Sequence, residues 1–343
     1  MKAIVQEGSG SPDVLKLREI ERPVVGDDDV LVRVRAASVN AMDCHLLKMP
    51  LAVRRLLARS RRVLIPGVDL AGQVEAVGRN VTRFKPGDEV FGNANGAFAE
   101  YASTRADRVA AKPRALPFKE AAALPVAGLT ALQGLRDKAR VQPGQRVLIH
   151  GAGGGVGTFA VQIAKALGAH VTAVTGTRNL DVVRALGPDE IIDYTQEDFV
   201  RRGEKYDVFF DVAATRPIRD CLRVLVPKGV LVGVGAPKDG GMGTVLWSML
   251  VSLIMSLAAT QRFVILMAKG RSADLTALAE LVTAGKMKPA IDREYALSET
   301  PEAIRYVTSG QARAKVIIDV DRAGDAAAYR QTRGSSEPRT HTE

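Results

Sequence analysis

The stretch RVLIHGAGGGVG, residues 146–157, decides the fold. RVLIH (146–150) is a short apolar run typical of a buried strand, and glycines follow it directly. The next segment, VGTFAVQIAKALG (156–168), places apolar side chains at the i, i+3, i+4, i+7 spacing of one helical face and ends at a glycine. A strand that leads through a glycine turn into a helix predicts a βαβ unit that binds a dinucleotide.

Each glycine position in this turn has a mechanical role. In register, Ala152, Gly154 and Gly157 occupy the three fingerprint positions, with alanine replacing the first glycine. Gly154 lets the backbone approach a pyrophosphate, and Gly157 lets the helix close on the strand. The N–H groups of Gly155 and Val156 then face the anion at the positive end of the helix. The alternative is a glycine-rich turn that binds nothing.

The alternation of strand-like and helical segments continues after residue 168, whereas the sequence before residue 125 shows a different pattern. Strand-like and helical segments alternate at 170–175 (strand), 179–187 (helix), 190–194 (strand), 206–212 (strand), 217–229 (helix) and 230–235 (strand). This alternation predicts a doubly wound parallel sheet with both faces covered. Residues 1–124 instead show short β-type runs between Gly, Pro and Asp turns, which predict a compact β domain. The expected fold class is α/β with two domains.

The choice of nicotinamide cofactor depends on the end of the second strand, about twenty residues after the glycines, where an acid holds the ribose 2′-OH of NADH. The segment AVTGTRN (173–179) contains no acid. It offers hydroxyl, guanidinium and amide donors at Thr175, Thr177, Arg178 and Asn179. Such donors suit a 2′-phosphate dianion, which an acid would repel. We therefore predict NADPH; the alternative is that Arg178 is only a surface residue of a first helical turn.

Composition limits the other function classes. A chain of 343 residues has room for two domains at about 150 residues each. Its two cysteines, Cys44 and Cys221, cannot form a disulfide framework, so we expect a reducing compartment. The N-terminus becomes polar by residue 6 and carries no secretory signal, which makes the cytoplasm the expected location.

The net charge of +10 raises the question of an anionic partner. Five arginines crowd into Arg54–Arg62, on a stretch whose leucines suggest one side of a helix. We interpret this cluster as a solvated amphipathic insert, with an anion-recruiting rim or a membrane-surface patch as alternatives. Aromatic residues are only 5% and do not alternate with the basic ones, so we expect no nucleic-acid partner.

Two further segments need an interpretation. Residues 240–261 contain no charge and approach the length of a membrane-spanning helix. Because soluble-type helix and strand patterns resume after them, we expect a buried helix, a dimer surface or an apolar wall of the substrate cleft, and no transmembrane span. The polar residues 321–343 are expected to form a disordered tail.

Several motifs in series resemble the zinc-free quinone oxidoreductase branch of the medium-chain dehydrogenase/reductase superfamily over residues 1–320. They are SVNAMD (38–43), PGVDLAGQVEAVG (66–78), FKPGDEVFG (84–92), GAFAEYA (96–102), ALPVAGLTALQGL (123–135), GQRVLIHGAGGGVG (144–157), LGPDEIIDY (186–194) and ARAKVII (312–318). The resemblance implies a GroES-like β domain (1–125), a Rossmann NADP-binding domain (126–267) and a C-terminal return to the first domain (268–320).

The residues at the metal positions of zinc-dependent relatives argue against zinc here. Those relatives use a Gly-His-Glu stretch, whereas this chain has Gly67, Val68 and Asp69, and a valine side chain cannot bind a metal. Cys44 and His45 are adjacent, so their side chains diverge if the backbone is extended. We expect no metal site.

The resemblance also places side chains near the nicotinamide. Asn40 is expected to bond the acceptor carbonyl, Asp43 a water or a ribose hydroxyl, and Thr130 the nicotinamide amide. Tyr194 resembles the family tyrosine at the adenosine end. Asn40 and Asp43 have the alternative of stabilising a turn next to a strand end. The proton donor is not evident, and solvent is as plausible a source as any side chain.

Without zinc, the chain lacks a Lewis acid to polarise an alcohol, whereas quinones and α,β-unsaturated carbonyls accept hydride readily. We therefore predict a homodimeric NADPH-dependent reductase of quinones or enones. Two alternatives stay open. One is a metal-free NADP-dependent alcohol dehydrogenase. The other is a non-catalytic NADPH-sensing protein with a nucleic-acid or membrane-surface partner.

Overall fold

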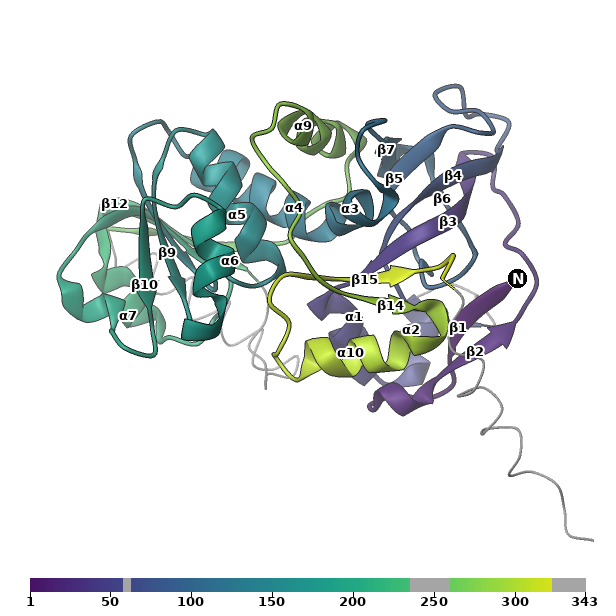
Figure 1. The fold of residues 1–343 in the computed structure, drawn as a ribbon, viewed down its shortest axis with the longest axis horizontal. Helices are drawn as coiled ribbons and strands as arrows, with labels where there is room; N and C mark the ends of the chain where they lie inside the picture. The colour runs from purple at the N-terminus through teal and green to yellow at the C-terminus, as the bar shows by residue number, and fades with distance from the viewer. Residues whose placement is uncertain (58–62, 235–259, 323–343) are drawn as a thin grey trace, which may run out of the picture.

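The computed structural model describes residues 1–57, 63–234 and 260–322, which form two sheets joined by a helical layer (Figure 1). One sheet is all parallel and the other is mixed, and a separate two-stranded ribbon pairs β1 with β2. The described residues therefore have the α/β, two-sheet architecture that the sequence predicts.

The parallel sheet contains β8 (Arg146–His150), β9 (His170–Thr175), β10 (Glu190–Asp193), β11 (Tyr206–Asp211), β12 (Leu225–Val234) and β13 (Arg262–Leu266). Its order is β10-β9-β8-β11-β12-β13, with every neighbouring pair parallel. This is the Rossmann order, and its topological switch point lies between β8 and β11. A ligand crevice is expected outside the carboxyl ends of those two strands.

Helices cover both faces of this sheet (Figure 1). They are α4 (Pro125–Leu132), the π-helical turn η3 (Gln133–Ala139), α5 (Gly155–Ala166), the 3₁₀ turn η4 (Thr177–Asn179), α6 (Leu180–Ala185), η5 (Phe199–Arg202) and α7 (Ile218–Arg223). The apolar face of α5 is completely buried at Phe159, Ala160 and Ile163, in the same core cluster as the alternate β8 residues Val147 and Ile149. Burial of this face, with the glycine before it, fixes where α5 begins.

The mixed sheet and the ribbon contain β1 (Lys2–Gln6), β2 (Leu15–Glu19), β3 (Asp29–Val39), β4 (Asp69–Val77), β5 (Glu89–Asn93), β6 (Tyr101–Arg105), β7 (Val109–Ala111), β14 (Ile291–Ala296) and β15 (Lys315–Asp319). The C-terminal strand β15 pairs antiparallel with β3, so that Val316 lies opposite Val39. Figure 1 shows this strand, in yellow, beside the purple N-terminal strands. The C-terminal segment thus completes the sheet that the N-terminal segment begins.

The remaining elements pack around this sheet: α1 (Ala41–Lys48), α2 (Leu51–Leu57), α3 (Phe118–Ala123), α9 (Ser272–Thr283), α10 (Thr300–Thr308), and the 3₁₀ turns η1 (Pro12–Val14), η2 (Ala106–Arg108) and η6 (Leu297–Glu299). A Cβ atom at Gly128 in α4 would lie 2.9 Å from Leu278 Cδ1 in α9. The close approach of these two helices ties the helical layer to the mixed sheet, because α9 also packs on β7.

Three sequence expectations need correction. The helix predicted over 217–229 ends at Arg223, and Leu225 already begins β12. Pro227 explains the difference, because proline lacks the N–H that a helix interior requires. Cys44 and His45 lie in α1 rather than in an extended segment; Cys44 is buried in the core and His45 is exposed. Arg54 is not fully solvated, since its Nη1 is buried without a hydrogen-bond partner among the described residues.

Three further predictions concern residues that lie outside the described ranges. These are the arginines at 59, 61 and 62 of the arginine cluster, nearly all of the apolar segment 240–261, and residues 323–343 of the tail. Within the described ranges, none of the helices combines the length and the apolar character that crossing a membrane requires.

Candidate functional site

The glycine turn lies at the carboxyl end of β8, next to the switch point of the parallel sheet. Gly154 caps α5 with extended backbone, and the helical hydrogen bonds start with Thr158 N donating to Gly154 O at 3.0 Å. The N–H groups of residues 155–157 therefore precede the first intrahelical bond and point out of the helix end. This arrangement provides the donors and the dipole that bind an anion.

The spacing within the turn explains why it needs glycine. A Cβ atom at Gly157 would lie 2.1 Å from Gly151 O, so only glycine lets α5 close on the turn. A Cβ atom at Gly154 would meet no atom of the described residues nearer than 3.5 Å. Gly154 is therefore not required by packing, and its lack of a side chain leaves the open side of the turn free for a ligand. Ala152, the remaining fingerprint position, is fully buried.

A second group of predicted residues lies at the carboxyl ends of β9 and β10. Thr175 ends β9 and is buried, while η4 carries the Thr177, Arg178 and Asn179 side chains. Arg178 donates a short hydrogen bond to Gly310 O, which belongs to the C-terminal segment. The structure thus gathers these donors where the sequence predicts them and joins them to a distant part of the chain.

Asp193 and Tyr194 complete this group. Thr177 Oγ1 donates to Asp193 Oδ2 at 2.6 Å, and this bond lowers the pKa of Asp193. Tyr194 is 55% exposed, and its hydroxyl lies 3.0 Å from where a Cβ atom of Gly176 would stand. The end of β9 has no acidic residue, but the neighbouring strand β10 supplies Asp193 at this place. The Asp193 carboxylate accepts the hydrogen bond from Thr177. The β9 sequence alone does not predict this hydrogen bond between Thr177 and Asp193.

The glycine turn packs directly on this group. A Cβ atom at Gly153 would lie 2.6 Å from Asn179 Nδ2 and 2.8 Å from Thr175 Oγ1. Asn179 Oδ1 is buried and has no hydrogen-bond partner among the described residues. A buried acceptor in this state is costly unless a ligand or a water supplies a donor. Asn179 is therefore placed to receive a hydrogen bond from a bound molecule.

The crevice wall at the switch point is held by a pair that the sequence did not single out. His150 Nδ1 lies 2.9 Å from Asp211 Oδ1, and both side chains are buried at the carboxyl ends of β8 and β11. Asp211 Oδ1 also accepts a hydrogen bond from Ala214 N at 2.9 Å. Ala214 has a φ of 48°, a strained left-handed conformation for a residue with a Cβ atom. The pair thus fixes the turn after β11, which packs on the glycine turn: a Cβ atom on Gly151 would lie 3.2 Å from Ala213 N.

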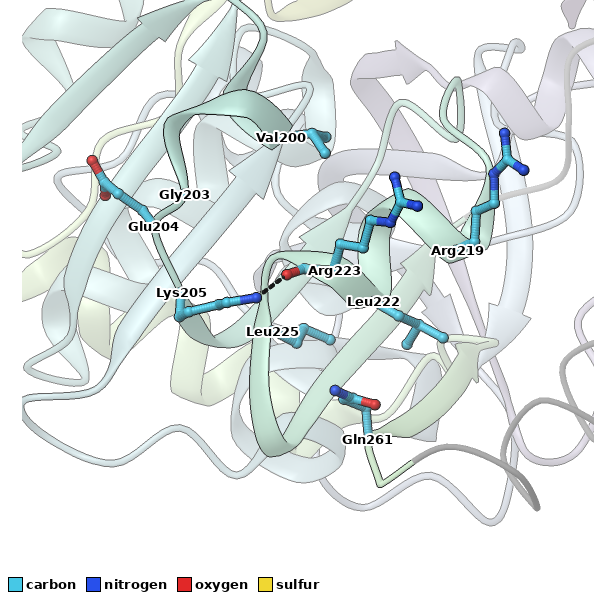
Figure 2. Close-up of a pocket in the computed structure, with 9 residues that line it drawn as sticks. All are labelled: Val200, Gly203, Glu204, Lys205, Arg219, Leu222, Arg223, Leu225 and Gln261. Carbon is cyan, nitrogen blue, oxygen red and sulfur yellow. Dashed lines mark hydrogen bonds between the residues drawn. The ribbon is translucent and has the colours of Figure 1, made fainter.

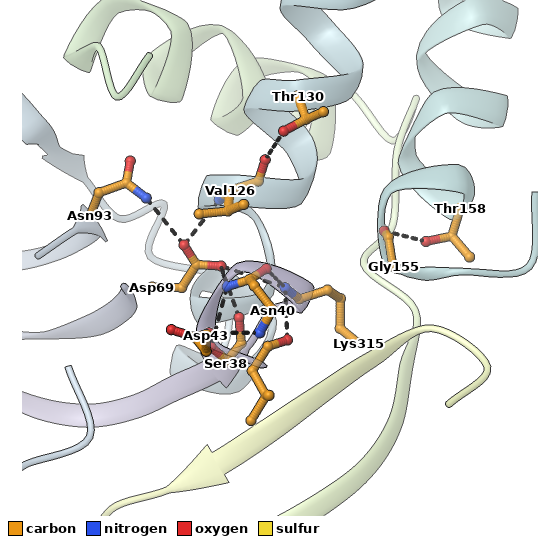
Figure 3. A network of polar contacts seen from close by, with 11 residues as sticks. Ser38, Asn40, Asp43, Asp69, Asn93, Val126, Thr130, Gly155, Thr158 and Lys315 are labelled. Carbon is orange, nitrogen blue, oxygen red and sulfur yellow. Dashed lines mark hydrogen bonds and ion pairs between the residues drawn. The ribbon is translucent and has the colours of Figure 1, made fainter. Parts of the chain in front are cut away.

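The other end of the site is a buried polar network centred on Asp69 (Figure 3). Asp69 is 0% exposed and accepts hydrogen bonds from Ser38 Oγ at 2.9 Å, Asn40 Nδ2 at 2.9 Å, Asn93 Nδ2 at 3.1 Å and Val126 N at 3.0 Å. These donors come from β3 and the residue after it, from β5 and from α4. The carboxylate therefore ties the helical layer to the mixed sheet.

Asn40 and Asp43 both belong to this network. Asn40 caps α1, and its N–H donates to Asp43 Oδ2 at 2.8 Å. The Asn40 side chain is buried and already bonded, through Nδ2 to Asp69 and through Oδ1 to Lys315. Asp43 Oδ1 is buried and has no partner among the described residues. Burial raises the pKa of Asp43 to about 7, and the backbone N–H of Asn40 lowers it in part.

Lys315 supplies the positive charge of the network. Its Nζ donates to Asn40 Oδ1 at 2.6 Å and lies 3.5 Å from both Asp69 Oδ2 and Val39 O. It begins β15 and is only 2% exposed, and burial lowers the pKa of its ammonium group. The sequence reasoning missed Lys315 and the role of Asp69. The one available signal was a charged residue at the start of each of two otherwise apolar runs, KVII and DLAG.

Thr130 joins the network through α4. Its Oγ1 donates to Val126 O at 2.6 Å, one turn earlier, and Val126 N in turn donates to Asp69. The hydroxyl oxygen of Thr130 still has the capacity to accept a hydrogen bond. The structure thus brings Asn40, Asp43 and Thr130 together.

The glycine turn connects the two groups of residues. A Cβ atom at Gly155 would lie 3.3 Å from Lys315 Cδ, while Gly153 packs on Asn179. Figure 3 shows Gly155 and Thr158 on one side of Lys315 and the Asp69 network on the other. One continuous site therefore runs from β9 and β10, past the glycine turn, to the buried network.

A separate hollow of about 520 Å³ lies elsewhere, lined by Val200, Gly203, Glu204, Lys205, Arg219, Leu222, Arg223, Leu225 and Gln261 (Figure 2). It is located at the amino ends of β11 and β12, whereas the glycine turn follows the carboxyl end of β8. Because the sheet is parallel, these ends lie at opposite edges. The hollow contains none of the predicted site residues, and in the part of the chain that the structure describes we find no cluster of three His, Cys, Asp or Glu side chains able to hold a metal.

A Rossmann sheet joined to a mixed sheet, with an anion-binding turn at the switch point and a polar network opposite, defines a nicotinamide-dependent oxidoreductase. Comparison with known proteins gives the family. Residues 26–114 match the alcohol dehydrogenase GroES-like domain model, and residues 186–318 match the model described as zinc-binding dehydrogenase.

Two curated relatives and one solved structure illustrate the similarity. The chain is 34% identical over 333 residues to the chloroplastic quinone-oxidoreductase homolog of Spinacia oleracea, covering 93% of the chain and 98% of the relative. It is 33% identical over 339 residues to the 2-methylene-furan-3-one reductase of Solanum lycopersicum, covering 93% and 79%. It is 25% identical to the Escherichia coli quinone oxidoreductase complexed with NADPH, with a TM-score of 0.78 and coverage of 93% and 100%.

The chain belongs to the quinone oxidoreductase-like branch of the medium-chain dehydrogenase/reductase superfamily. This confirms the family and the GroES-like and Rossmann architecture predicted from the sequence. Residues 186–318 match a zinc-binding dehydrogenase family, but Val68 stands at the histidine position of the Gly-His-Glu stretch. The absence of a metal site remains a prediction.

Proposed function

We propose that this chain transfers a hydride from NADPH to a quinone or an α,β-unsaturated carbonyl, without a metal ion. The observation that carries the proposal is the open side of Gly154 among the described residues, where the N–H groups that begin α5 lack an intrahelical partner and lie near a buried polar network. With a diphosphate bound there, Asn40 and Thr130 are the residues that would hold the nicotinamide end of the cofactor.

The residues present fit NADPH. The α5 terminus supplies N–H donors for a diphosphate, and Asn179 Oδ1 is a buried acceptor that lacks a donor. Arg178 is adjacent to it and provides a cation for a 2′-phosphate, while Tyr194 flanks the same end across Gly176. When bound, NADPH supplies the hydride. We assign the preference for NADPH over NADH to two features. One is the Arg178 guanidinium, and the other is the hydrogen bond that Thr177 donates to the Asp193 carboxylate.

The chain contributes orientation and exclusion of water. The donors at Gly155, Val156 and Gly157 hold the diphosphate, and Thr130 is assigned to the nicotinamide amide. Asn40 and Asp43 shape the acceptor end, where burial keeps solvent from the reacting atoms. An electron-poor conjugated acceptor needs no Lewis acid, which matches a site built from hydrogen bonds.

The relatives support the acceptor class. Their names include a quinone-oxidoreductase homolog and a 2-methylene-furan-3-one reductase, the second of which acts on a conjugated carbonyl. We also propose a homodimer, which light scattering tests directly, with no nucleic-acid partner. A cytoplasmic location stays a prediction, because relatives are named as chloroplastic and mitochondrial.

The test combines binding and turnover. NADPH and NADH are titrated against the purified chain by calorimetry, and oxidation of NADPH is then followed with a panel of quinones, enones and simple alcohols or ketones. We expect tighter binding of NADPH and turnover on quinones or enones. Turnover confined to simple alcohols and ketones would favour the alcohol dehydrogenase alternative, and binding with no turnover would favour a sensing protein.

A further inference from the structure

The burial of Lys315 calls for an explanation other than stability. Its side chain is 2% exposed, and its nearest carboxylate oxygen, Asp69 Oδ2, lies 3.5 Å away. The free-energy cost of removing two charges from water exceeds the attraction between them at a distance of 3.5 Å. Well-packed apolar residues in place of such a pair often stabilise a protein equally well. The strand around it, KVIID, is otherwise apolar through its first four residues and would accept an apolar residue at this position. The ammonium group therefore has another role.

The short contact of Lys315 identifies that role. Nζ donates to Asn40 Oδ1 at 2.6 Å, and Asn40 Nδ2 donates to Asp69 Oδ2 at 2.9 Å. A carboxamide that is held at both its oxygen and its nitrogen has one orientation. Without the Lys315 bond, Asn40 Oδ1 becomes a buried acceptor with no donor. The Asn40 carboxamide is then no longer held in this orientation at its oxygen.

The aliphatic part of Lys315 lies beside the start of α5. Its Cδ lies 3.3 Å from the position of a Cβ atom on Gly155, the first residue of α5. Ala314 O lies 3.6 Å from the same point. In Figure 3 the side chain extends from β15 toward the network, past Gly155. A single residue thus contacts the helix end assigned to the diphosphate and the carboxamide assigned to the acceptor.

We propose that Lys315 is a positioning residue that sets the orientation of Asn40 relative to the start of α5. This inference rests on the proposed function, because it assigns Lys315 to the same site. Its ammonium group holds the Asn40 carboxamide, and its stem spaces that carboxamide from the cofactor-binding turn. Lys315 itself is not placed to touch the acceptor, since Asn40 and Asp69 surround its charged end.

The chain offers a matched control in Lys112. This lysine is also buried, at 8% exposure, and its Nζ is bonded to Leu116 O at 2.6 Å, Pro113 O at 3.0 Å and Glu89 Oε2 at 3.0 Å. It follows β7, and within the described residues its ammonium group bonds neither the network nor the glycine turn. Lys112→Met therefore removes a buried ammonium group without touching the site.

The experiment compares Lys315→Met with Lys112→Met in the full-length protein. We expect Lys315→Met to bind NADPH close to the wild type in calorimetry, while kcat on the best acceptor falls by about 10²-fold, the cost of a misplacement of about 1 Å. Lys112→Met keeps the wild-type kcat, even where both variants lose thermal stability. Equal kcat values for the two variants would overturn the proposal.

A double variant separates positioning from charge compensation. Asp69→Asn with Lys315→Met removes both of these charges, so that Asp69 is not left as an unpaired buried carboxylate, and it serves as the test where Lys315→Met alone does not fold. We expect kcat to stay low. A return of kcat to the wild-type value would mean that Lys315 only neutralises Asp69, and the proposal would fail.

A crystal structure of the folded variant gives a readout that does not depend on turnover. We expect the Asn40 carboxamide to leave its single orientation toward Asp69. An unchanged carboxamide would contradict the proposal, whatever the kinetics. If the wild type turns over no acceptor, the proposed function fails, and this structural comparison still decides whether Lys315 positions Asn40.

Discussion

Replacing Gly154 by alanine separates binding from folding. Among the described residues, a Cβ atom at this position meets no atom nearer than 3.5 Å, so the methyl group fits this part of the folded chain. Gly154 caps α5, and exchanging a favoured N-cap residue for alanine costs about 1 kcal/mol of stability. The methyl group points into the open side of the turn, where we place the diphosphate. The variant should therefore fold but bind NADPH weakly.

The expected loss can be worked out from the contacts at the turn. Losing one hydrogen bond to a charged group costs about 2 kcal/mol, which is about a 30-fold rise in Kd. At an NADPH concentration 100 times the wild-type Kd, binding stabilises the wild type by about 2.7 kcal/mol. The same concentration stabilises the variant by about 0.9 kcal/mol, because it is then only about three times the new Kd.

Gly157→Ala provides the contrast. Its Cβ atom would stand 2.1 Å from Gly151 O and 2.7 Å from Ala152 Cα, both of which are backbone atoms that cannot rotate away. Overpacking of this kind typically costs about 1–3 kcal/mol. This variant should therefore lose stability without any ligand, in contrast to Gly154→Ala.

Thermal unfolding with and without NADPH measures both variants. We expect Gly154→Ala to unfold near the wild-type temperature without NADPH and to gain much less from its addition. Gly157→Ala should unfold at a lower temperature in both conditions. A Gly154→Ala protein that gains as much from NADPH as the wild type would refute the placement of the diphosphate at this turn.

Three further predictions address the two ends of the site. Arg178→Gln should raise the Kd for NADPH about 30-fold, from the loss of about 2 kcal/mol, and leave the Kd for NADH unchanged; equal effects on both cofactors in calorimetry would exclude a 2′-phosphate contact. Asp193→Asn removes a carboxylate next to Thr177 and should tighten NADPH binding, and a weaker affinity would show that the acid assists instead. Asp43→Asn tests the buried carboxyl, whose pKa of about 7 lies above the unfolded value of 3.8. The wild type should therefore lose stability relative to this variant as pH rises from about 4 to 7. The loss is at most about 4 kcal/mol, at about 1.4 kcal/mol per pKa unit. Melting temperatures of the two proteins that change in parallel with pH would contradict this.

The sequence predicts the parallel sheet well because its signals are local. An apolar run, a glycine turn and an amphipathic face follow one another in RVLIHGAGGGVG and the helix after it, so neighbours in sequence are neighbours in space. The helix predicted over 217–229 is too long because apolar residues continue past Arg223, whereas Pro227 lacks the N–H that a helix interior requires.

The buried network could not be predicted in the same way. Lys315 and Asn40 are 275 residues apart in sequence, and only the pairing of β15 with β3 brings them together. Likewise, Asp193 reaches Thr177 because β10 pairs with β9. Asn40 and Asp43 were chosen by resemblance to a family, and the bonds that occupy the Asn40 side chain became visible only in three dimensions.

We place the diphosphate of NADPH at the start of α5, the 2′-phosphate near Arg178 and the nicotinamide near the Asp69 network. A crystal structure of the wild type grown with NADPH checks this placement. We predict diphosphate oxygens within hydrogen-bond distance of the N–H groups of residues 155–157 and a 2′-phosphate that contacts the Arg178 guanidinium. A cofactor bound elsewhere, or a crevice closed by protein side chains, would contradict the account.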